Sequence, residues 1–397
     1  MYLNCHSFHS LRYGTIPLED LIRQAVECGV TAMALTDINT VTGIYDFVKG
    51  CGEARIKPVV GMEFRCKNML RYIGLARNAG GLAEMNRFLT QHNFDKKILP
   101  LAAPDFSEVF IIYPLENAPL ILRENEYIGI RPEELQKLIL SEWKNRQEKM
   151  VILQPVTFRT KKEYELHKIL RAIDLNTIFS KLKPTDYCRN SEIMVAAERI
   201  LNCYGQYPGI IANTEKIIWE CNFEFDFKTP KNKKFYTTNR KDDMVLLTAL
   251  AKEGVEWRYG KNNPEAESRM LRELKVIDQL EFSGYFLITW DIIKYSNSQG
   301  FLHVGRGSGA NSIIAYCLGI TDICPLELDL YFERFLNENR KSPPDFDIDW
   351  SWKERDVILE YIFDRYGHEN VAFCGTNVEF KYKSIFREVG KEYGLPK

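Results

Sequence analysis

The chain has 397 residues, which is enough for two or three domains with full hydrophobic cores. Hydrophobic residues make up 45% of it and charged residues 27%, so a disordered, collagen-like or low-complexity chain is excluded. The formal net charge is −1, so a nucleic-acid partner would have to meet a local basic surface. No apolar run approaches the ~18 residues needed to span a bilayer, which excludes an integral membrane protein.

The cysteine pattern and the first residues indicate the cellular compartment. Ten cysteines are scattered along the chain and none falls in a CxxC pair, so we predict neither a zinc ribbon nor a disulfide framework. The start, MYLNCHSFHS, has neither the basic nor the apolar region of a secretory signal. We therefore expect reduced thiols in a cytoplasmic protein.

Short apolar segments alternate with amphipathic segments along residues 1–227. We predict strands at residues 31–37, 57–64, 71–76, 109–113 and 151–158, and helices at residues 15–29, 41–54, 81–92, 132–140 and 161–173. Strands that alternate with helices of this length indicate a parallel sheet. So many units of this kind favour a closed or nearly closed βα barrel.

A composition break separates this series from the rest of the chain. The segment 228–243, KTPKNKKFYTTNRKDD, is polar and predominantly basic, and we interpret it as a linker. The alternative is a basic surface loop within one domain. Residues 244–397 are expected to form a second domain. Its predicted helices lie at residues 244–258, 263–280, 284–295, 353–366 and 381–393, and a strand, a glycine-rich loop and a helix follow one another over residues 301–319.

Three aspartates alternate with apolar residues in the segment PPDFDIDW, residues 343–350. On a strand, Asp345, Asp347 and Asp349 would share one face, with successive Cα atoms about 6.5–7 Å apart. Such close carboxylates raise one another's pKa unless a cation neutralises them. Oxygen ligands of this kind suit Mg²⁺, and two Mg²⁺ ions can clamp the oxygens of an in-line phosphoryl displacement. The alternative is an exposed acidic edge strand.

A glycine-rich loop, GRGSG at residues 305–309, precedes these aspartates. Glycines let backbone N–H groups turn toward an anion, and the helix expected after the loop would offer its positive end. Arg306 adds a fork of donors and Ser308 a hydroxyl group. The loop lacks the Lys-Ser/Thr ending of a Walker A motif, and a tight structural turn is the alternative. Together, the loop and the aspartates predict a site for a nucleoside triphosphate and a metal, and hence nucleotidyl transfer.

Five blocks within residues 284–397 resemble, in the same order, the palm of the bacterial replicative DNA polymerase III alpha subunit (the C family). They are GYFLITWDIIKY, VGRGSGANSIIAYCLGITD, PLELDLYFERFLN, PPDFDIDW, and RDVILEYIFDRYG with FREVGKEYGLPK. Nearer the start, HSFHSLRYG, ALTDINTVTG and IKPVVGMEF resemble the polymerase-and-histidinol-phosphatase (PHP) domain that precedes this palm. The resemblance implies an α/β and α+β chain. A distorted TIM-like βα barrel would be followed by part of a nucleotidyltransferase-like palm, similar to that of polymerase beta.

The resemblance also implies an activity, ligands and partners. The activity is DNA-directed nucleotidyl transfer to a primer 3′ end with two Mg²⁺ ions, in DNA replication. Asp347 and Asp349 match the two metal-binding carboxylates, whereas Asp345 matches an aspartate outside the metal pair. The implied positions for binding the phosphates of the nucleotide are Gly305, Arg306, Gly307, Ser308, Gly309 and Lys383. The implied partners are primer–template DNA, deoxynucleoside triphosphates, the sliding clamp and other replisome subunits, with no membrane partner.

Two departures from the family pattern carry their own expectations. The family's third catalytic aspartate lies downstream of these 397 residues, so we expect this chain alone not to extend a primer. In the PHP part, Asn4 and Ile38 stand where active relatives have metal-binding histidines. The remaining candidates, His6, Asp37 and Glu63, could hold one Zn²⁺ or Mn²⁺ ion weakly as a vestigial site. We therefore expect this domain to be catalytically silent and kept as a scaffold.

The sequence leaves two other functions open. The first is a metal-dependent phosphoesterase or exonuclease that runs on the PHP barrel, and it predicts hydrolysis that is independent of Asp347 and Asp349. The second is a non-catalytic scaffold module that holds partners or DNA without chemistry.

Overall fold

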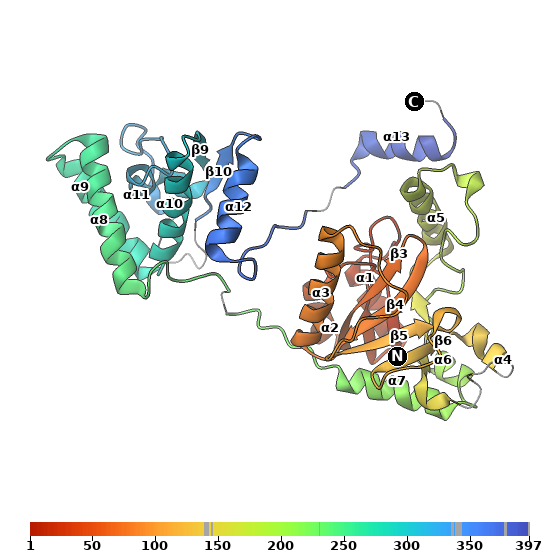
Figure 1. Cartoon of the computed structure of the whole chain (residues 1–397). Helices are drawn as coiled ribbons and strands as arrows, with labels where there is room; N and C mark the ends of the chain where they lie inside the picture. The colour runs from red at the N-terminus through yellow and green to blue at the C-terminus, as the bar shows by residue number, and fades with distance from the viewer. Residues whose placement is uncertain are drawn as a thin grey trace. The chain divides into compact units, whose positions relative to one another are not determined.

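The computed structural model describes residues 1–138, 143, 146–229, 231–334, 337, 344–376 and 379–395. The chain splits into two compact units (Figure 1). The sheet unit comprises residues 1–227 and 375–397, and the hairpin unit comprises residues 228–374.

In the part of the chain that the structure describes, one eight-stranded sheet forms the centre of the sheet unit. Its strands are β1 (Tyr2–Cys5), β2 (Ala32–Leu35), β3 (Lys57–Cys66), β4 (Met69–Ala76), β5 (Val109–Pro114), β6 (Glu126–Ile130), β7 (Met150–Ile152) and β8 (Pro155–Val156). Most neighbouring strands are parallel, as the alternation of strands and helices predicts. The prediction is wrong at β4, which is antiparallel to β3 and β5 because a tight turn at Lys67 and Asn68 joins it directly to β3.

The sheet curls into a half-barrel. Its spatial order is β7-β6-β5-β4-β3-β2-β1-β8, so the two end strands are β7 and β8. Only Leu153 and Gln154 separate these two strands in the chain, so the two ends of the sheet approach each other. This arrangement confirms the distorted TIM-like βα barrel expected from the sequence.

Helices flank the sheet because both of its faces are apolar. Buried side chains alternate along the strands, so that Leu3, Ala34 and Val59 belong to one cluster and Met33 and Leu35 to another. The helices of this part are α1 (Leu18–Glu27), α2 (Ile44–Glu53), α3 (Ala79–Phe94), α4 (Leu135–Leu138), α5 (Lys161–Leu175), α6 (Ala197–Cys203) and α7 (Pro208–Glu220). Helix α2 packs on β3, α3 on β4 and α7 on β7 (Figure 1).

The topology gathers polar residues at one edge of the sheet. Strands β1, β2 and β8 run parallel and end at the same edge. His6 and Thr157 directly follow β1 and β8, and Thr36 and Asp37 follow β2. Polar side chains at the carboxyl ends of barrel strands are where active sites of such barrels lie, so this edge is the place to examine for a metal centre.

The hairpin unit is mainly helical and has its own core. It contains α8 (Arg240–Tyr259), α9 (Pro264–Gln279), α10 (Ser283–Ser298), β9 (His303–Arg306), α11 (Ile313–Cys317), β10 (Asp347–Trp350) and α12 (Arg355–Tyr366). Helices α8, α9, α10 and α11 bury one apolar cluster against which Phe346, Ile348 and Trp350 pack. Strands β9 and β10 form an antiparallel hairpin that brings the glycine-rich loop beside the aspartates. Helix α8 begins at Arg240, inside the predicted linker, because the Asn239 side chain caps it.

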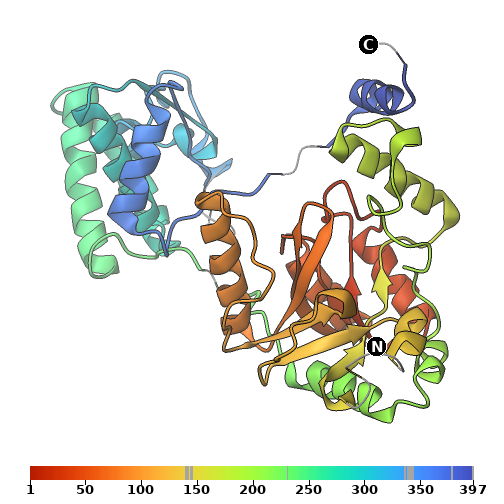
Figure 2. The ribbon, with the colours of Figure 1, turned by 45° about the vertical axis from the view of Figure 1, so that its right-hand side comes forward.

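The last helix, α13 (Tyr382–Glu392), belongs to the sheet unit. Figures 1 and 2 show it beside α5, and the ring of Tyr393 stacks on Phe179 with centroids 5.8 Å apart. The expected domain boundaries at residues 227 and 244 stay a prediction. None of the helices in the described part of the chain combines the length and apolar character needed to cross a bilayer.

Candidate functional site

An arginine joins the two predicted metal ligands in the β9–β10 hairpin. The pairing places Asp347 opposite Arg306, and Asp349 opposite Val304. The Arg306 guanidinium donates from Nη1 to Asp347 Oδ2 at 2.9 Å and from Nε to Asp349 Oδ2 at 2.6 Å. These side chains are roughly half exposed: 57% for Arg306, 46% for Asp347 and 56% for Asp349. Hydrogen bonding from Arg306 also lowers the pKa of Asp349.

Asp345 lies outside the strand and contacts the glycine-rich loop. The sequence predicts that it shares a strand face with Asp347 and Asp349, but β10 begins at Asp347, so that prediction is wrong. Its carboxylate accepts from the Ser308 hydroxyl at 2.5 Å and from the Ser308 backbone N–H at 3.2 Å. Its backbone carbonyl accepts from the Gly309 N–H at 3.0 Å. These hydrogen bonds clamp the loop onto the segment that leads into β10.

The three glycines of the loop are required by close packing. A Cβ on Gly305 would lie 1.8 Å from the Ile320 carbonyl oxygen, and one on Gly309 would lie 2.3 Å from the Phe346 ring. Gly307 has φ +92°, a conformation that side chains disfavour. The glycines therefore let the loop approach both its own hairpin and the core. The alternative of a tight structural turn thus accounts for the glycines without a ligand.

The helix after the loop does not offer a free positive end. A short 3₁₀ turn, Ser308–Asn311, separates the loop from α11. The Ser312 side chain caps α11, and Glu273 of α9 accepts from the Ser312 hydroxyl at 2.7 Å and from the Ile313 N–H at 2.9 Å. Burial raises the pKa of Glu273 to about 7. The expectation that this helix terminus contacts a phosphate is therefore wrong, because a buried carboxyl group already occupies it.

Helix α10 packs against the apolar side of the β9–β10 hairpin. Phe346 packs against Tyr285 and Phe286, with ring centroids 5.3 and 5.1 Å away. The Trp350 indole donates to the Ser296 hydroxyl at 2.8 Å. The apolar side of β10 is therefore anchored in the core, while its two carboxylates face outward.

The hairpin carboxylates fit a Mg²⁺ site by their chemistry. Two partly exposed carboxylates, Asp347 and Asp349, contact the same cationic group, the Arg306 guanidinium. The backbone therefore holds both side chains where they can bind one shared cation. Mg²⁺ is commonly held by one or two carboxylates together with waters and substrate phosphates. Asp347 and Asp349 are the residues that would hold it.

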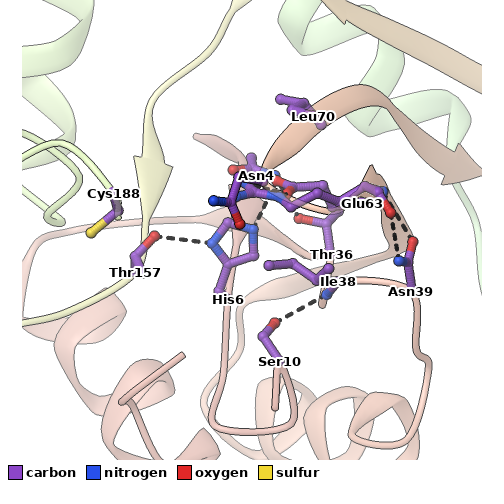
Figure 3. Close-up of polar contacts among 12 residues, drawn as sticks. Asn4, His6, Ser10, Thr36, Ile38, Asn39, Glu63, Leu70, Thr157 and Cys188 are labelled. Atoms are coloured by element: carbon purple, nitrogen blue, oxygen red, sulfur yellow. Dashed lines mark hydrogen bonds and ion pairs between the residues drawn. The ribbon is translucent and has the colours of Figure 1, made fainter. Parts of the chain in front are cut away.

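The edge of the sheet in the sheet unit carries a second polar cluster, which is buried (Figure 3). His6 Nε2 lies 2.9 Å from Glu63 Oε2, which also accepts from the Asn4 side chain at 3.0 Å. The other oxygen of Glu63 accepts from Arg65 Nε at 2.6 Å. Burial alone would raise the pKa of Glu63, but Arg65, His6 and Asn4 hold it well below its ordinary value. The Arg65 guanidinium also lies over the Tyr13 ring, 4.4 Å from its centroid.

Hydrogen bonding extends from His6 to the opposite side of the cluster. Thr157 donates its hydroxyl proton to Glu192 at 2.8 Å, and Glu192 also pairs with Arg131 at 3.1 Å. The Thr157 hydroxyl also lies 3.0 Å from His6 Nδ1. Both ring nitrogens of His6 therefore have hydrogen-bond partners, Thr157 on one side and Glu63 on the other.

Asp37 is held apart from the other two candidate ligands by serine donors. Its carboxylate accepts from the Ser7 backbone N–H at 2.7 Å, the Ser7 hydroxyl at 2.7 Å and the Ser10 hydroxyl at 2.6 Å. The Ser10 hydroxyl also accepts from the backbone N–H of Ile38 at 3.0 Å. Position 38 is where the family pattern has a histidine. Asp37 thus fixes the loop after β1.

The cluster does not fit a metal ion, so the structure lends no support to the vestigial site at His6, Asp37 and Glu63, which stays a prediction. In the described residues no group of three or more His, Cys, Asp or Glu side chains is arranged to hold a metal. Glu63 is already paired with Arg65 and His6, and Glu192 with Arg131. A divalent cation at Glu63 would face the positive charge of the Arg65 guanidinium, which has no lone pair to offer it.

Comparison with known proteins finds a family model for each of two parts of the chain. The model of the PHP domain matches residues 3–142, and that of the bacterial DNA polymerase III alpha NTPase domain matches residues 245–397. The chain is similar to alpha subunits of bacterial DNA polymerase III and to error-prone DNA polymerases. The Escherichia coli alpha subunit is 28% identical, over 100% of this chain and 38% of the relative. The alpha subunit of Borreliella burgdorferi is 28% identical over 100% and 39%, and the error-prone DNA polymerase of Symbiobacterium thermophilum is 28% identical over 100% and 41%.

The chain spans about two fifths of the length of these DNA polymerase relatives. Of the phosphate-binding positions implied by the polymerase resemblance, Gly305 to Gly309 lie together in the hairpin unit. Lys383 lies on α13, in the sheet unit, and its part in nucleotide binding stays a prediction.

Residues that matter in the PHP cluster include three that sequence reasoning missed. Arg65 follows Glu63 by two positions on β3, and strand alternation could have placed both on one face. Glu192 and Arg131 lie in loop and turn regions far along the chain, and no local pattern connects them with His6.

Proposed function

We propose that this chain is part of a DNA-directed DNA polymerase and that its hairpin unit binds the incoming nucleotide and the metal. The observation that carries this proposal is the β9–β10 pairing, which brings the GRGSG loop beside Asp347 and Asp349. The reaction class is template-directed transfer of a nucleotide to a primer 3′ end. Primer–template DNA and deoxynucleoside triphosphates are the partners that this reaction requires. The sliding clamp, other replisome subunits and a cytoplasmic location follow from the same proposal.

The residues of the hairpin have separable roles in this reaction. Asp347 and Asp349 would hold Mg²⁺, which when bound supplies neutralisation of the charge that develops during phosphoryl transfer. Ser308 and the backbone N–H groups of the loop would donate to phosphate oxygens. Arg306 would add a charged fork that matches phosphate geometry. Lys383 is proposed as a further phosphate contact.

Equilibrium binding tests this assignment without relying on polymerisation. Binding of dATP in the presence of Mn²⁺ is measured on the 397-residue chain by isothermal titration calorimetry. We expect Asp347→Asn and Asp349→Asn each to weaken Mn²⁺-dependent binding at least tenfold. The control Asp278→Asn removes an exposed carboxylate of the same unit that also pairs with an arginine. Equal affinities for all four proteins would refute the assignment.

We also propose that the PHP part acts as a non-catalytic scaffold. The charge balance of its buried cluster supports this, because Arg65 and His6 already satisfy Glu63. The alternative function, a phosphoesterase or exonuclease, would need a metal at this edge of the sheet. The test is hydrolysis of a chromogenic phosphodiester with added Zn²⁺ or Mn²⁺. Turnover that Glu63→Gln abolishes and Asp347→Asn leaves intact would refute the scaffold proposal.

A further inference from the structure

Asp345, just before the hairpin strand β10, and Asp347 and Asp349 within it are each paired with a group that would otherwise contact the nucleotide or its metal. Asp347 and Asp349 share the Arg306 guanidinium, at 2.9 and 2.6 Å. Asp345 accepts from the hydroxyl and the N–H of Ser308, which are donors proposed for a phosphate. Arg306 therefore occupies the position of a divalent cation relative to its two carboxylates. The Asp345 carboxylate occupies the position of a phosphate group relative to the loop.

These pairings are of a kind that a ligand can replace. Arg306, Asp347 and Asp349 are all about half exposed, and exposed ion pairs contribute little because water competes for both partners. A divalent ion brings two positive charges to the carboxylates where the guanidinium brings one. A triphosphate brings several acceptor oxygens to the loop where Asp345 brings two. The loop backbone itself needs no rearrangement, because its glycines are fixed by close contacts to the core.

We propose, building on the function proposed above, that the hairpin rests in a self-paired state which the metal–triphosphate complex opens by exchanging partners. The metal takes Asp347 and Asp349 from Arg306, and the triphosphate takes Ser308 from Asp345. The released guanidinium, next to the loop, then becomes available to the phosphates. Metal binding therefore makes triphosphate binding tighter, and by linkage the triphosphate tightens metal binding by the same factor.

The first arm of the test measures the metal alone. Mn²⁺ affinity of the full chain is determined by electron paramagnetic resonance without nucleotide, for wild type and Arg306→Gln. We expect Arg306→Gln to bind Mn²⁺ about three- to tenfold more tightly, since the competing cation is gone. Arg240→Gln is the matched control, because Arg240 is also exposed and also bridges two carboxylates, Asp278 and Glu281. Its Mn²⁺ affinity should equal that of wild type.

The second arm measures the triphosphate alone. Binding of a fluorescent dATP analogue is followed in the presence of EDTA, for wild type and Asp345→Asn. We expect Asp345→Asn to bind several-fold more tightly, since its neutral side chain competes less well for Ser308. Asp322→Asn is the control, because it removes an exposed carboxylate that pairs with Arg258 elsewhere in the unit.

The outcomes distinguish a failure of this proposal from a failure of the function proposed above. If Mn²⁺ affinity is the same in Arg306→Gln, Arg240→Gln and wild type, while Asp347→Asn abolishes it, the self-paired state is refuted and the metal site stands. If Asp345→Asn gains no more triphosphate affinity than Asp322→Asn, the phosphate half is refuted. If Asp347→Asn leaves Mn²⁺ binding unchanged even in the Arg306→Gln background, the proposed function itself fails.

Discussion

Replacing Arg65 tests whether an internal cation has taken the place of a metal in the PHP cluster. Arg65→Met keeps most of the side-chain volume and removes the charge that faces Glu63. Glu63 is 1% exposed and the Arg65 side chain 13% exposed, so the substitution leaves a buried carboxylate short of its main partner. Breaking one side of a buried ion pair typically costs about 3–5 kcal/mol, and loss of the contact with Tyr13 adds to it. This is a large part of the ~5–15 kcal/mol that stabilises a typical domain.

The assay is urea unfolding followed by hydrogen–deuterium exchange of amides in β1, β2 and β3, which reports on the sheet unit separately. Arg77→Met is the control, because Arg77 and its partner Glu220 are both about one-third exposed, and such a pair contributes less than about 1 kcal/mol. The double variant Arg65→Met/Glu63→Gln removes both charges and should recover at least about 2 kcal/mol. A cost of Arg65→Met no greater than that of Arg77→Met would refute the reasoning.

Three further predictions follow from the same geometry. EDTA should leave the unfolding midpoint of the sheet unit unchanged, and mass spectrometry of the purified chain should find less than stoichiometric Zn²⁺ or Mn²⁺; a midpoint that falls on chelation would contradict this. Gly305→Ala should destabilise the hairpin unit by more than about 2 kcal/mol in urea unfolding, because its Cβ would overlap the Ile320 carbonyl, whereas Gly300→Ala, at φ +73° in open space, should cost only about 1 kcal/mol. The pKa of Glu273 is raised from 4.5 to about 7, so the unfolded chain ionises first as pH rises, and the hairpin unit should lose about 3 kcal/mol of stability between pH 4.5 and 7. Glu273→Gln should abolish that loss, and an unchanged pH profile in this variant would count against the assignment.

Local sequence pattern predicts the elements of this protein better than their directions. The alternation of apolar strands and amphipathic helices correctly predicts the parallel pair of β2 and β3, whereas β1 falls in no predicted strand. It fails at β4, because a turn at Lys67 and Asn68 replaces the crossover helix that a parallel neighbour needs. The single predicted strand at residues 151–158 is divided into β7 and β8, because Gln154 lies between the two ends of the curled sheet. Such features depend on how the sheet curls, which no local window contains.

The candidate sites show the same difference between what a local sequence pattern predicts and what depends on distant residues. Asp347, Asp349 and the GRGSG loop are recognisable because each is a compact motif, and the structure pairs them in one hairpin. The position of Asp345 depends on a hydrogen bond to Ser308, which lies far from it in the sequence. Likewise, a buried charge balance is a property of the whole cluster. The count of histidines alone predicts a weakened metal site, but the observed network joins five separate parts of the chain: residues 4–6, 63–65, 131, 157 and 192.

The difference in burial explains why Arg65 stays paired with its carboxylate, whereas Arg306 can be displaced from its carboxylates by a metal ion. Arg65 and Glu63 are enclosed by the PHP barrel, where an unpaired carboxylate is costly, and Arg65 is further held over the Tyr13 ring. Any ion that displaced Arg65 would have to desolvate completely and leave a buried guanidinium without its partner. Arg306 faces water, so its guanidinium is rehydrated as soon as it leaves Asp347 and Asp349. The same ion pair chemistry therefore closes the first cluster to metals and leaves the second open to exchange.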